Sequence, residues 1–514
     1  MTVLSIAMHC AALRRMGPLM GFAPVVILAG CALQRHEPRP IDPAVSQAAH
    51  LARRSDDAAL RDAMSRLGID TTTWPLRAWD APELSALALS SHPDLAVARA
   101  EVAVARSVGQ TARQRANPSL ELSIERHSEP GSNDSPWSIG IAVDTWVGAW
   151  LLGESRRQAL ADTADAQQLE AVEHAARVAW QVHRRVRDSH RALHESLQMS
   201  SLADETLALQ REESTLWQRR MTLGAAGAPE VLPSQQRQAV ALRDAHRARQ
   251  AVDQANAALA QAIGLPLEQT RQMPLRFDSL AGRLAPQPAD KATASLPDPV
   301  LEPLELQRAA LLNNIAVRIA LARYAAADAT LRLEIARQLP ELSLIPGYAW
   351  DQGDHRWSLG IGYALPLSNR NDGPIAEARD RRAAEAARFD ALQAQAIADL
   401  DAARLAAGAS AAQQADALRH LASARTLAER ITRRVEQGDA DRLERITGRR
   451  LELDARRALI EAQAALGNAY AAIEDVVQRP LPSAAKVLLE PALASMTDPT
   501  SRVVAHPHPT DPSR

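Results

Sequence analysis

The chain has 514 residues, of which 46% are hydrophobic but only 3% aromatic, and its charges nearly cancel to a formal net charge of −2. This balance excludes a basic nucleic-acid-binding surface spread over the whole chain. Ala, Leu, Arg, Gln and Glu favour helices, so the composition predicts long helices and not a β-rich enzyme. Both cysteines, Cys10 and Cys31, lie near the start, and the rest of the chain has no cysteine for disulfides or a zinc site.

Residues 1–30 have the pattern of a secretory signal. Two arginines precede an apolar run, 22–30, that is too short for a comfortable membrane span. Small residues before Cys31 resemble the lipobox of bacterial lipoproteins, so we expect cleavage there and acylation of Cys31. In such lipoproteins the residue after the cysteine influences sorting, and Ala32 at that position is consistent with sorting to the outer membrane. An ordinary signal peptide or an uncleaved anchor is the alternative, and a translation start at Met8 is also open.

Three short segments occur twice, in the same order, which indicates an old internal duplication. They are the proline segments around Pro118 and Pro340, the Trp-Ser-Ile-Gly-Ile and Trp-Ser-Leu-Gly-Ile segments at 137–141 and 357–361, and the glycines Gly224 and Gly438. Each half is predicted to contain a leading helix, two short strands, a very long helix, a glycine-centred turn and a returning helix. In the first half, Asp80 and Glu83 resemble a capping box at the start of the leading helix.

Each half contains a long stretch with few helix breakers. Residues 154–223 have neither Gly nor Pro, and residues 375–437 have no Pro and one glycine, Gly408. As helices these stretches would measure about 105 Å and about 95 Å, whereas a compact domain is only roughly 40–50 Å across. The helices must therefore protrude or pack side by side in an assembly. A globular helical bundle, which also buries broad helix faces, is the alternative.

The helix after Gly438 carries two apolar stripes, which predicts neighbours on two of its sides. One stripe consists of Leu443, Ile446, Leu453, Ile460, Ala464, Gly467 and Ala471, and the other of Ala455, Leu459, Ala462 and Leu466.

Four short segments alternate large apolar residues with small or polar ones, as lipid-facing and lumen-facing residues alternate in transmembrane barrel strands. The apolar positions are Leu120, Leu122 and Ile124; Trp137, Ile139, Ile141 and Val143; Leu342, Leu344, Tyr348 and Trp350; and Trp357, Leu359, Ile361, Tyr363 and Leu365. The connections at 127–136 and 351–356 are polar and are expected to be exposed loops. Soluble hairpins with one face on a core are the alternative.

If these strands cross a membrane, more than one chain must contribute to the barrel. Unpaired backbone groups at a strand edge cost too much free energy in lipid, so a barrel must close. Four strands are too few, because known barrels begin at about eight. We therefore expect several chains to share one barrel, and three chains would supply twelve strands.

These features together resemble the TolC family of outer-membrane efflux proteins over roughly residues 80–480. The resemblance is carried by the duplicated proline strand starts, the paired Trp-Ser-x-Gly-Ile strands and the two glycine turns. Residues 365–376 resemble the family's passage from barrel strand to tunnel helix, and the His-Pro-Asp-Leu segment 92–95 resembles the start of its first repeat. Among subgroups, lipoprotein members that serve resistance-nodulation-division pumps, including CzcC-like metal exporters, look most similar.

The resemblance implies a mainly α protomer with a small β part, assembled as a homotrimer in the cell outer membrane. Twelve strands would form the barrel in outer-membrane lipid, and twelve helices a periplasmic tunnel. The helix tips would dock a periplasmic adaptor protein, which couples to an inner-membrane resistance-nodulation-division pump. The protein would be a passive exit duct for small solutes or metal ions. A periplasmic coiled-coil scaffold lipoprotein without a pore is the alternative.

By the same resemblance Gly224 and Gly438 lie at the periplasmic helix tips, where glycine eases a sharp reversal. Asp439 and Asp441 follow the second tip and would recur threefold in a trimer. Rings of carboxylates favour cations and can narrow a pore, so these two residues are the candidate gate. The alternative is solvated acids at a helix N-terminus, and Arg442 is a possible partner for either.

No constellation predicts an enzyme, a cofactor or a metal site. His190 and His194 are four residues apart but lack the glutamate of a zincin helix, so packed or solvated histidines are expected. The pair His506 and His508, and the Ser483 to Lys486 spacing, lie in a Pro-broken tail without companion motifs.

The predicted domain organisation follows from these segments. It comprises a lipoprotein signal peptide at 1–30, an N-terminal tether at 31–80, a first repeat at 81–267, a connector at 268–304, a second repeat at 305–480 and a disordered tail at 481–514.

Overall fold

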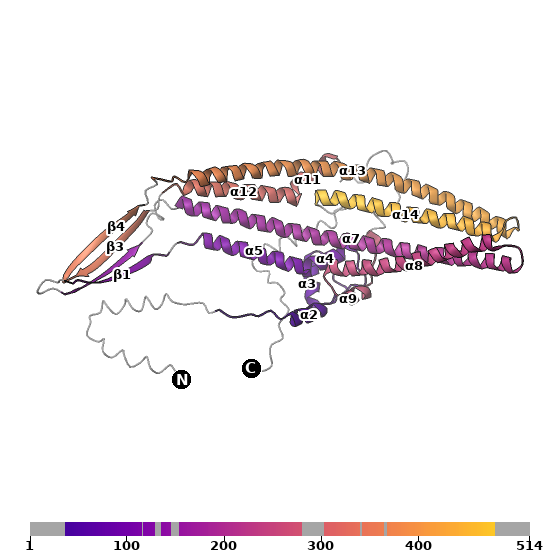
Figure 1. Cartoon of the computed structure of the whole chain (residues 1–514), viewed down its shortest axis with the longest axis horizontal. Coiled ribbons are helices and arrows are strands. Elements are labelled where there is room, and N and C mark those ends of the chain that lie inside the picture. The colour runs from indigo at the N-terminus through magenta and orange to yellow at the C-terminus, as the bar shows by residue number, and fades with distance from the viewer. Residues whose placement is uncertain are drawn as a thin grey trace, which may run out of the picture. The chain divides into compact units, whose positions relative to one another are not determined.

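A computed structural model of the chain describes residues 36–115, 117–128, 135–144, 154–279, 303–339, 342–363 and 367–478. The chain divides into two units, Met1–Ala52 and Arg53–Arg514. In the first unit the described part holds helix α2 (Pro43–Leu51), whose N-cap is Asp42. All other described elements belong to the second unit (Figure 1).

In the second unit the same order of elements occurs in each half. The first half contains α5 (Pro93–Ala112), β1 (Ser119–Arg126), β2 (Trp137–Asp144), α7 (Glu154–Thr222) and α8 (Ala228–Ile263), and the second contains α12 (Ile315–Ala336), β3 (Leu342–Asp351), β4 (Asp354–Tyr363), α13 (Asp372–Glu436) and α14 (Arg442–Val477). Shorter helices accompany them: α3 (Ala58–Arg66), α4 (Ala81–Ser91), α9 (Leu267–Gln272) and α11 (Pro303–Leu312). Among the described residues, no helix combines the length and the apolar character needed to cross a membrane.

The two long helices predicted from the breaker-free stretches are present. Helix α7 has 69 residues and α13 has 65. Helix α8 returns alongside α7, and α14 alongside α13 (Figure 1). Two antiparallel pairs of long helices therefore form the body of this unit, with α5 and α12 packed on α7 near the sheet.

The four strands form one antiparallel sheet in the order β1-β2-β3-β4, so the second hairpin continues the first. One row across the sheet reads Leu122, Ile141, Tyr348 and Trp357, and the adjacent row reads Ser123, Gly140, Ala349 and Arg356. The predicted alternation is therefore confirmed for the described residues, which do not include Leu365: one face is apolar, and the other is small or polar except for Ile345. The apolar face is open, with Leu122 64% and Trp357 82% exposed, so no core of the described chain covers it, contrary to the soluble-hairpin alternative.

One predicted connection is wrong in its bounds. The stretch 351–356 was expected to be a loop, but β3 continues to Asp351 and β4 begins at Asp354. Only Gln352 and Gly353 form the turn, and both have positive φ (55° and 117°), as tight hairpin turns require. The alternation of large residues stops before the ladder of hydrogen bonds does, and this is why the sequence pattern ended the strand too early.

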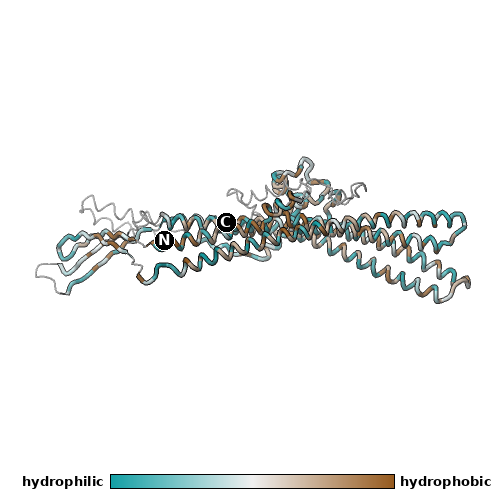
Figure 2. Tube along the Cα trace, turned by 90° about the horizontal axis from the view of Figure 1, so that it is seen from above, coloured by the Kyte–Doolittle hydropathy of each residue, from teal (hydrophilic) through white to brown (hydrophobic). Residues whose placement is uncertain are grey.

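The largest apolar core lies in the middle of the body, where α4, α5 and the end of α8 pack on α7 (Figure 2). Fully buried Leu84 and Leu87 of α4 belong to it, behind the capping box that the sequence predicted at Asp80 and Glu83. Met64 of α3 also joins this core. Part of the expected tether is therefore folded, and so is the start of the expected connector, where α9 lies.

The two apolar stripes of α14 have the two neighbours that they predicted. Ile446 and Leu453 of the first stripe pack against Leu202 and Leu209 of α7. Ala455 of the second stripe packs against α13 in a cluster with Leu421 and Ala424. Helix α14 is therefore wedged between the two long helices, and it joins the two halves of the chain.

Candidate functional site at the helix tips

Both long helices end at a glycine with a left-handed backbone. Gly224, after α7, has φ 72°, and Gly438, after α13, has φ 82°. In each turn the amide after the glycine bonds a carbonyl of the last helical turn: Ala225 N–H donates to Arg220 O and Asp439 N–H to Arg434 O, both at 2.8 Å. This is the Schellman pattern, and only glycine adopts its positive φ without steric cost.

Asp441 joins the two tips. It occupies the N-cap position of α14, but its carboxylate makes no cap hydrogen bond and accepts one from the Arg220 guanidinium at the end of α7. This contact holds the pKa of Asp441 below its usual value. Both side chains are partly exposed, so the pair contributes about 1 kcal/mol or less. It is an ion pair that can break at small cost.

The two candidate gate residues differ in their surroundings. Asp439 is exposed, and the described residues offer its carboxylate no hydrogen bond or ion pair; its backbone carbonyl accepts from Arg434 at 3.1 Å. Asp441 is paired with Arg220, and not with Arg442 as its neighbouring position suggested. Sequence reasoning missed Arg220. The duplication contained a signal for it, because Arg220 and Arg434 each lie four residues before the tip glycine.

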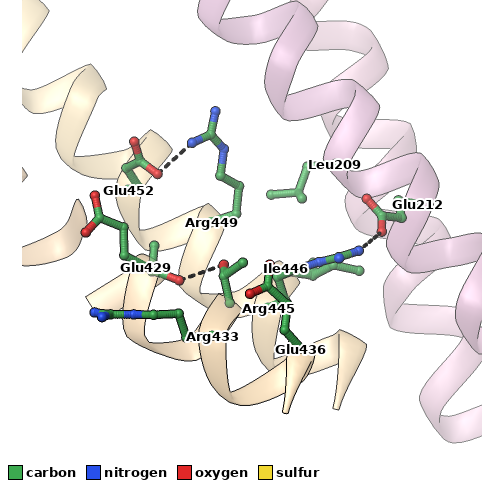
Figure 3. A pocket seen from close by; sticks show the side chains of 11 residues that line it. Leu209, Glu212, Glu429, Arg433, Glu436, Arg445, Ile446, Arg449 and Glu452 are labelled. Carbon is green, nitrogen blue, oxygen red and sulfur yellow. Dashed lines mark hydrogen bonds and ion pairs between the residues drawn. The ribbon is translucent and has the colours of Figure 1, made fainter. Parts of the chain in front are cut away.

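A groove of about 640 Å³ opens near the tips between α7, α13 and α14 (Figure 3). Two ion pairs lie along it: Arg445 of α14 with Glu212 of α7 at 3.0 Å, and Arg449 with Glu452 at 2.6 Å. On the α13 side the groove is lined by Glu429, Arg433 and Glu436, for which the described part of the chain provides no ion pair. That wall therefore presents unpaired charges of both signs.

The contact between α7 and α14 continues from the groove to the middle of the body. Toward the tips, Glu205 and Glu212 of α7 pair with Arg456 and Arg445 of α14, and all four side chains are partly exposed. In the middle, Arg187 of α7 is buried against Glu474 of α14. Ion pairs are worth little at the surface, and a buried one is costly to break. The tip half of this contact is therefore held more weakly than the middle.

His190 and His194 both pack against Phe277. His190 is fully buried, its Nε2 lies 2.8 Å from the carbonyl oxygen of Arg276, and both rings lie 4.6 Å from the ring of Phe277. Burial lowers the pKa of both histidines. In the described part of the chain no three possible ligands come together at a metal-sized site. Cys31, Ser483, Lys486, His506 and His508 lie outside the described residues.

Comparison with known proteins gives a family match over part of the chain and a likeness of fold. Residues 84–265 match the model of the outer membrane efflux protein family. Among solved structures, the outer membrane protein VceC of Vibrio cholerae is 16% identical with a TM-score of 0.59, over 77% of this chain and 95% of that one. The outer-membrane channel OprN is 19% identical with a TM-score of 0.62, over 87% and 99%.

The CmeC outer membrane channel of Campylobacter jejuni is 12% identical with a TM-score of 0.60, over 92% of this chain and 100% of that one. At these identities the likeness concerns the fold. No curated protein matches the sequence.

Proposed function

We propose that this chain is a member of the outer membrane efflux protein family, whose model matches residues 84–265, and that it forms the trimeric exit duct of a tripartite efflux system. The observation that carries the proposal is the four-stranded sheet. One face is apolar and open, and each outer strand, β1 and β4, has one edge without a partner among the described residues. Such a sheet is unsuited to water, and by itself it is also unsuited to lipid.

Assembly of three copies would remove both problems. Neighbouring strands run antiparallel throughout the sheet, so β4 of one copy can pair with β1 of the next and keep the pattern. Three sheets then close a twelve-stranded barrel, with the face of Leu122 and Trp357 toward lipid and the face of Ser123 and Gly140 toward the lumen. The long helix pairs α7–α8 and α13–α14 of three copies would supply the twelve helices of a tunnel wall.

The helix tips would serve as the coupling end. The unpaired Glu429, Arg433 and Glu436 of the groove provide charges that a periplasmic adaptor can pair with, and the adaptor would connect the duct to an inner-membrane resistance-nodulation-division pump. Transport through the duct is passive, with energy supplied by the pump.

The cargo would be small solutes or metal ions, and membership of the CzcC-like subgroup stays a prediction. The same proposal includes two repeats, with boundaries at 81–267 and 305–480.

The proposed location is the outer membrane, with the helices in the periplasm. The signal peptide and lipobox pattern supply the export route, and acylated Cys31 would add a lipid anchor.

We assign the gate to the tips, with distinct roles for the two acids. Three copies of Asp439 would form an exposed carboxylate ring that attracts cations. Asp441 would act as a latch, because its pairing with Arg220 ties the start of α14 to the end of α7. Breaking three such pairs costs little, so a docked adaptor can open the tips by competing for the arginines.

Planar-bilayer conductance of the purified, acylated protein tests the proposal. We expect discrete channels, a heat-sensitive trimer on gels, and higher conductance in both Asp441→Ala and Arg220→Ala. Asp439→Ala should change cation block without opening the latch. Asp454→Ala is the matched control, because Asp454 is exposed on α14 and has no ion pair among the described residues. A monomer that conducts in no variant would favour the scaffold alternative.

A further inference from the structure

The joint between β2 and β3 is where the two halves of the sheet meet, and no turn fixes it. Strands β1 and β2 pair along all eight residues of each, and β3 and β4 along all ten. In contrast, β2 and β3 pair only over 138–142 and 347–351. Between them in the sequence lie α7, α8 and the start of the second half. Hairpin register is normally set by the turn, so another feature must set the register here.

Alternation of apolar and small residues restricts this register only in part. A slip by one residue would turn the apolar face of one hairpin toward the small face of the other, and is excluded. A slip by two residues keeps Ile139 and Ile141 on the same face as Tyr348 and Trp350. The apolar pattern therefore fits the observed register and a register displaced by two residues equally well.

Asp351 of β3 breaks this ambiguity, because side chains on β2, on β4 and directly after β1 converge on its carboxylate. Ser138, its partner across the joint, donates its hydroxyl to Oδ1. His127, directly after β1, places Nε2 2.8 Å from the Ser138 oxygen and 3.3 Å from Oδ1. Arg356 of β4 reaches Oδ2 at 2.6 Å. We call these four residues the Asp351 clasp.

The donors of the clasp are determined by chemistry. An ionised carboxylate only accepts, so the one hydroxyl proton of Ser138 goes to Asp351. His127 must then donate through Nε2–H to the Ser138 oxygen. Ser138 is 8% exposed and the Asp351 side chain 17%. Partial burial makes loss of these partners costly for the carboxylate.

A two-residue slip would dismantle the clasp. It would place Asp351 opposite Gly140 in one direction and opposite Pro136 in the other. Neither residue has a side-chain donor. Arg356 belongs to the same hairpin as Asp351, so it would move with it, whereas His127 and Ser138 would stay behind.

We propose that Asp351 is the positioning residue that sets the register between the two halves of the sheet, with His127 and Ser138 as its partners across the joint. Strand tilt and stagger in a closed barrel depend on every register around it. In the channel proposed above, the clasp would lie on the lumen side at the hairpin ends and would fix how three copies close. The clasp itself is contained in one protomer, so its test does not require conduction.

Engineered cysteines can report the register. A Cβ built at Gly140 lies 3.7 Å from Cβ of Ala349, inside the range of about 3.5–4.5 Å for a disulfide. Gly140→Cys with Ala349→Cys therefore reports the observed register, and Gly140→Cys with Gly347→Cys reports a slip by two. Ser123→Ala and Ser358→Ala accompany both pairs, because the Ser123 hydroxyl would meet a Cβ at position 140 and the Ser358 hydroxyl a Cβ at position 347. Cross-linking is scored by loss of thiol alkylation after oxidation, against the chain that has only Cys10 and Cys31.

The measured quantity is the ratio of the cross-linking yield of the in-register cysteine pair to that of the slipped pair. Asp351→Ala should lower this ratio by about tenfold, the order expected from lost hydrogen bonds to a charged group. Asp354→Ala, three residues away and without an ion pair among the described residues, should leave the ratio unchanged. Equal ratios in these two variants would overturn the proposal. If Asp351→Ala fails to fold, Ser138→Ala and His127→Ala decide, since each removes one donor across the joint; an unchanged ratio in both would also overturn it.

Discussion

Arg187 offers the sharpest test of how the two halves of the chain are held together. Its side chain is 7% exposed in the middle of α7, and Glu474 of α14 is 1% exposed. The guanidinium donates to Glu474 at 2.8 Å, and to Asp475 and Asp188 at 3.1 Å each. One buried cation is thus shared by three carboxylates, two of them on the other half of the chain.

Burial and charge act in opposite directions at this cluster. Burial by itself disfavours the charged guanidinium, but Glu474, Asp188 and Asp475 outweigh it and hold the pKa of Arg187 above its usual value. Burial raises the pKa of Asp475 despite the nearby arginines. Arg187→Gln would break this buried pair, which typically costs about 3–5 kcal/mol. Arg445 and Glu212, at 41% and 46% exposed, form the matched surface pair, worth about 1 kcal/mol or less.

Thermal unfolding followed by helical circular dichroism measures the difference. With an unfolding entropy of about 2.1 cal/mol/K per residue, a chain of this length shifts its midpoint by about 1 °C per kcal/mol. We expect Arg187→Gln to lower the midpoint by about 3–5 °C, and Arg445→Gln by about 1 °C or less. Equal shifts in the two variants would refute the claim that burial decides the strength of these pairs.

Three further predictions concern the middle of the body, the tips and the anchor. Burial lowers the pKa of His190, whose Nε2 lies 3.8 Å from Asp80, so its neutral form favours the fold. The free energy of unfolding should fall as pH drops below about 6.5, by at most about 1.4 kcal/mol per pH unit for one group; in urea titrations at pH 7 and pH 5, an equal fall in His190→Phe would contradict this. Gly438→Ala should destabilise by about 1–2 kcal/mol because of its positive φ, whereas Gly408→Ala, in an open position inside α13, should stabilise by about 0.5–1 kcal/mol; urea unfolding that gives both the same sign would refute the backbone argument. Cys31→Ser should abolish labelling by radioactive palmitate, and persistent label would move the acylation site elsewhere.

Local patterns in the sequence were sufficient to predict the elements and their faces. Breaker-free stretches gave the lengths of α7 and α13, and alternation gave the two faces of the sheet. The two stripes of α14 predicted its two neighbours. These properties are local, because the direction of side chains repeats every few residues along a helix or strand. The periodicity can therefore be recognised from neighbouring positions in the sequence. The glycine turns belong to the same class, since positive φ is a requirement of one residue.

Contacts between distant side chains became known only from the folded chain. Asp441 pairs with Arg220, and not with its neighbour Arg442, because α7 lies against α14. The same packing buries Arg187, while Arg445 on the same contact stays at the surface. The clasp on Asp351 arises only when the second hairpin is laid beside the first. Long-range pairing and burial depend on the path of the whole chain, and no periodicity along the sequence encodes them.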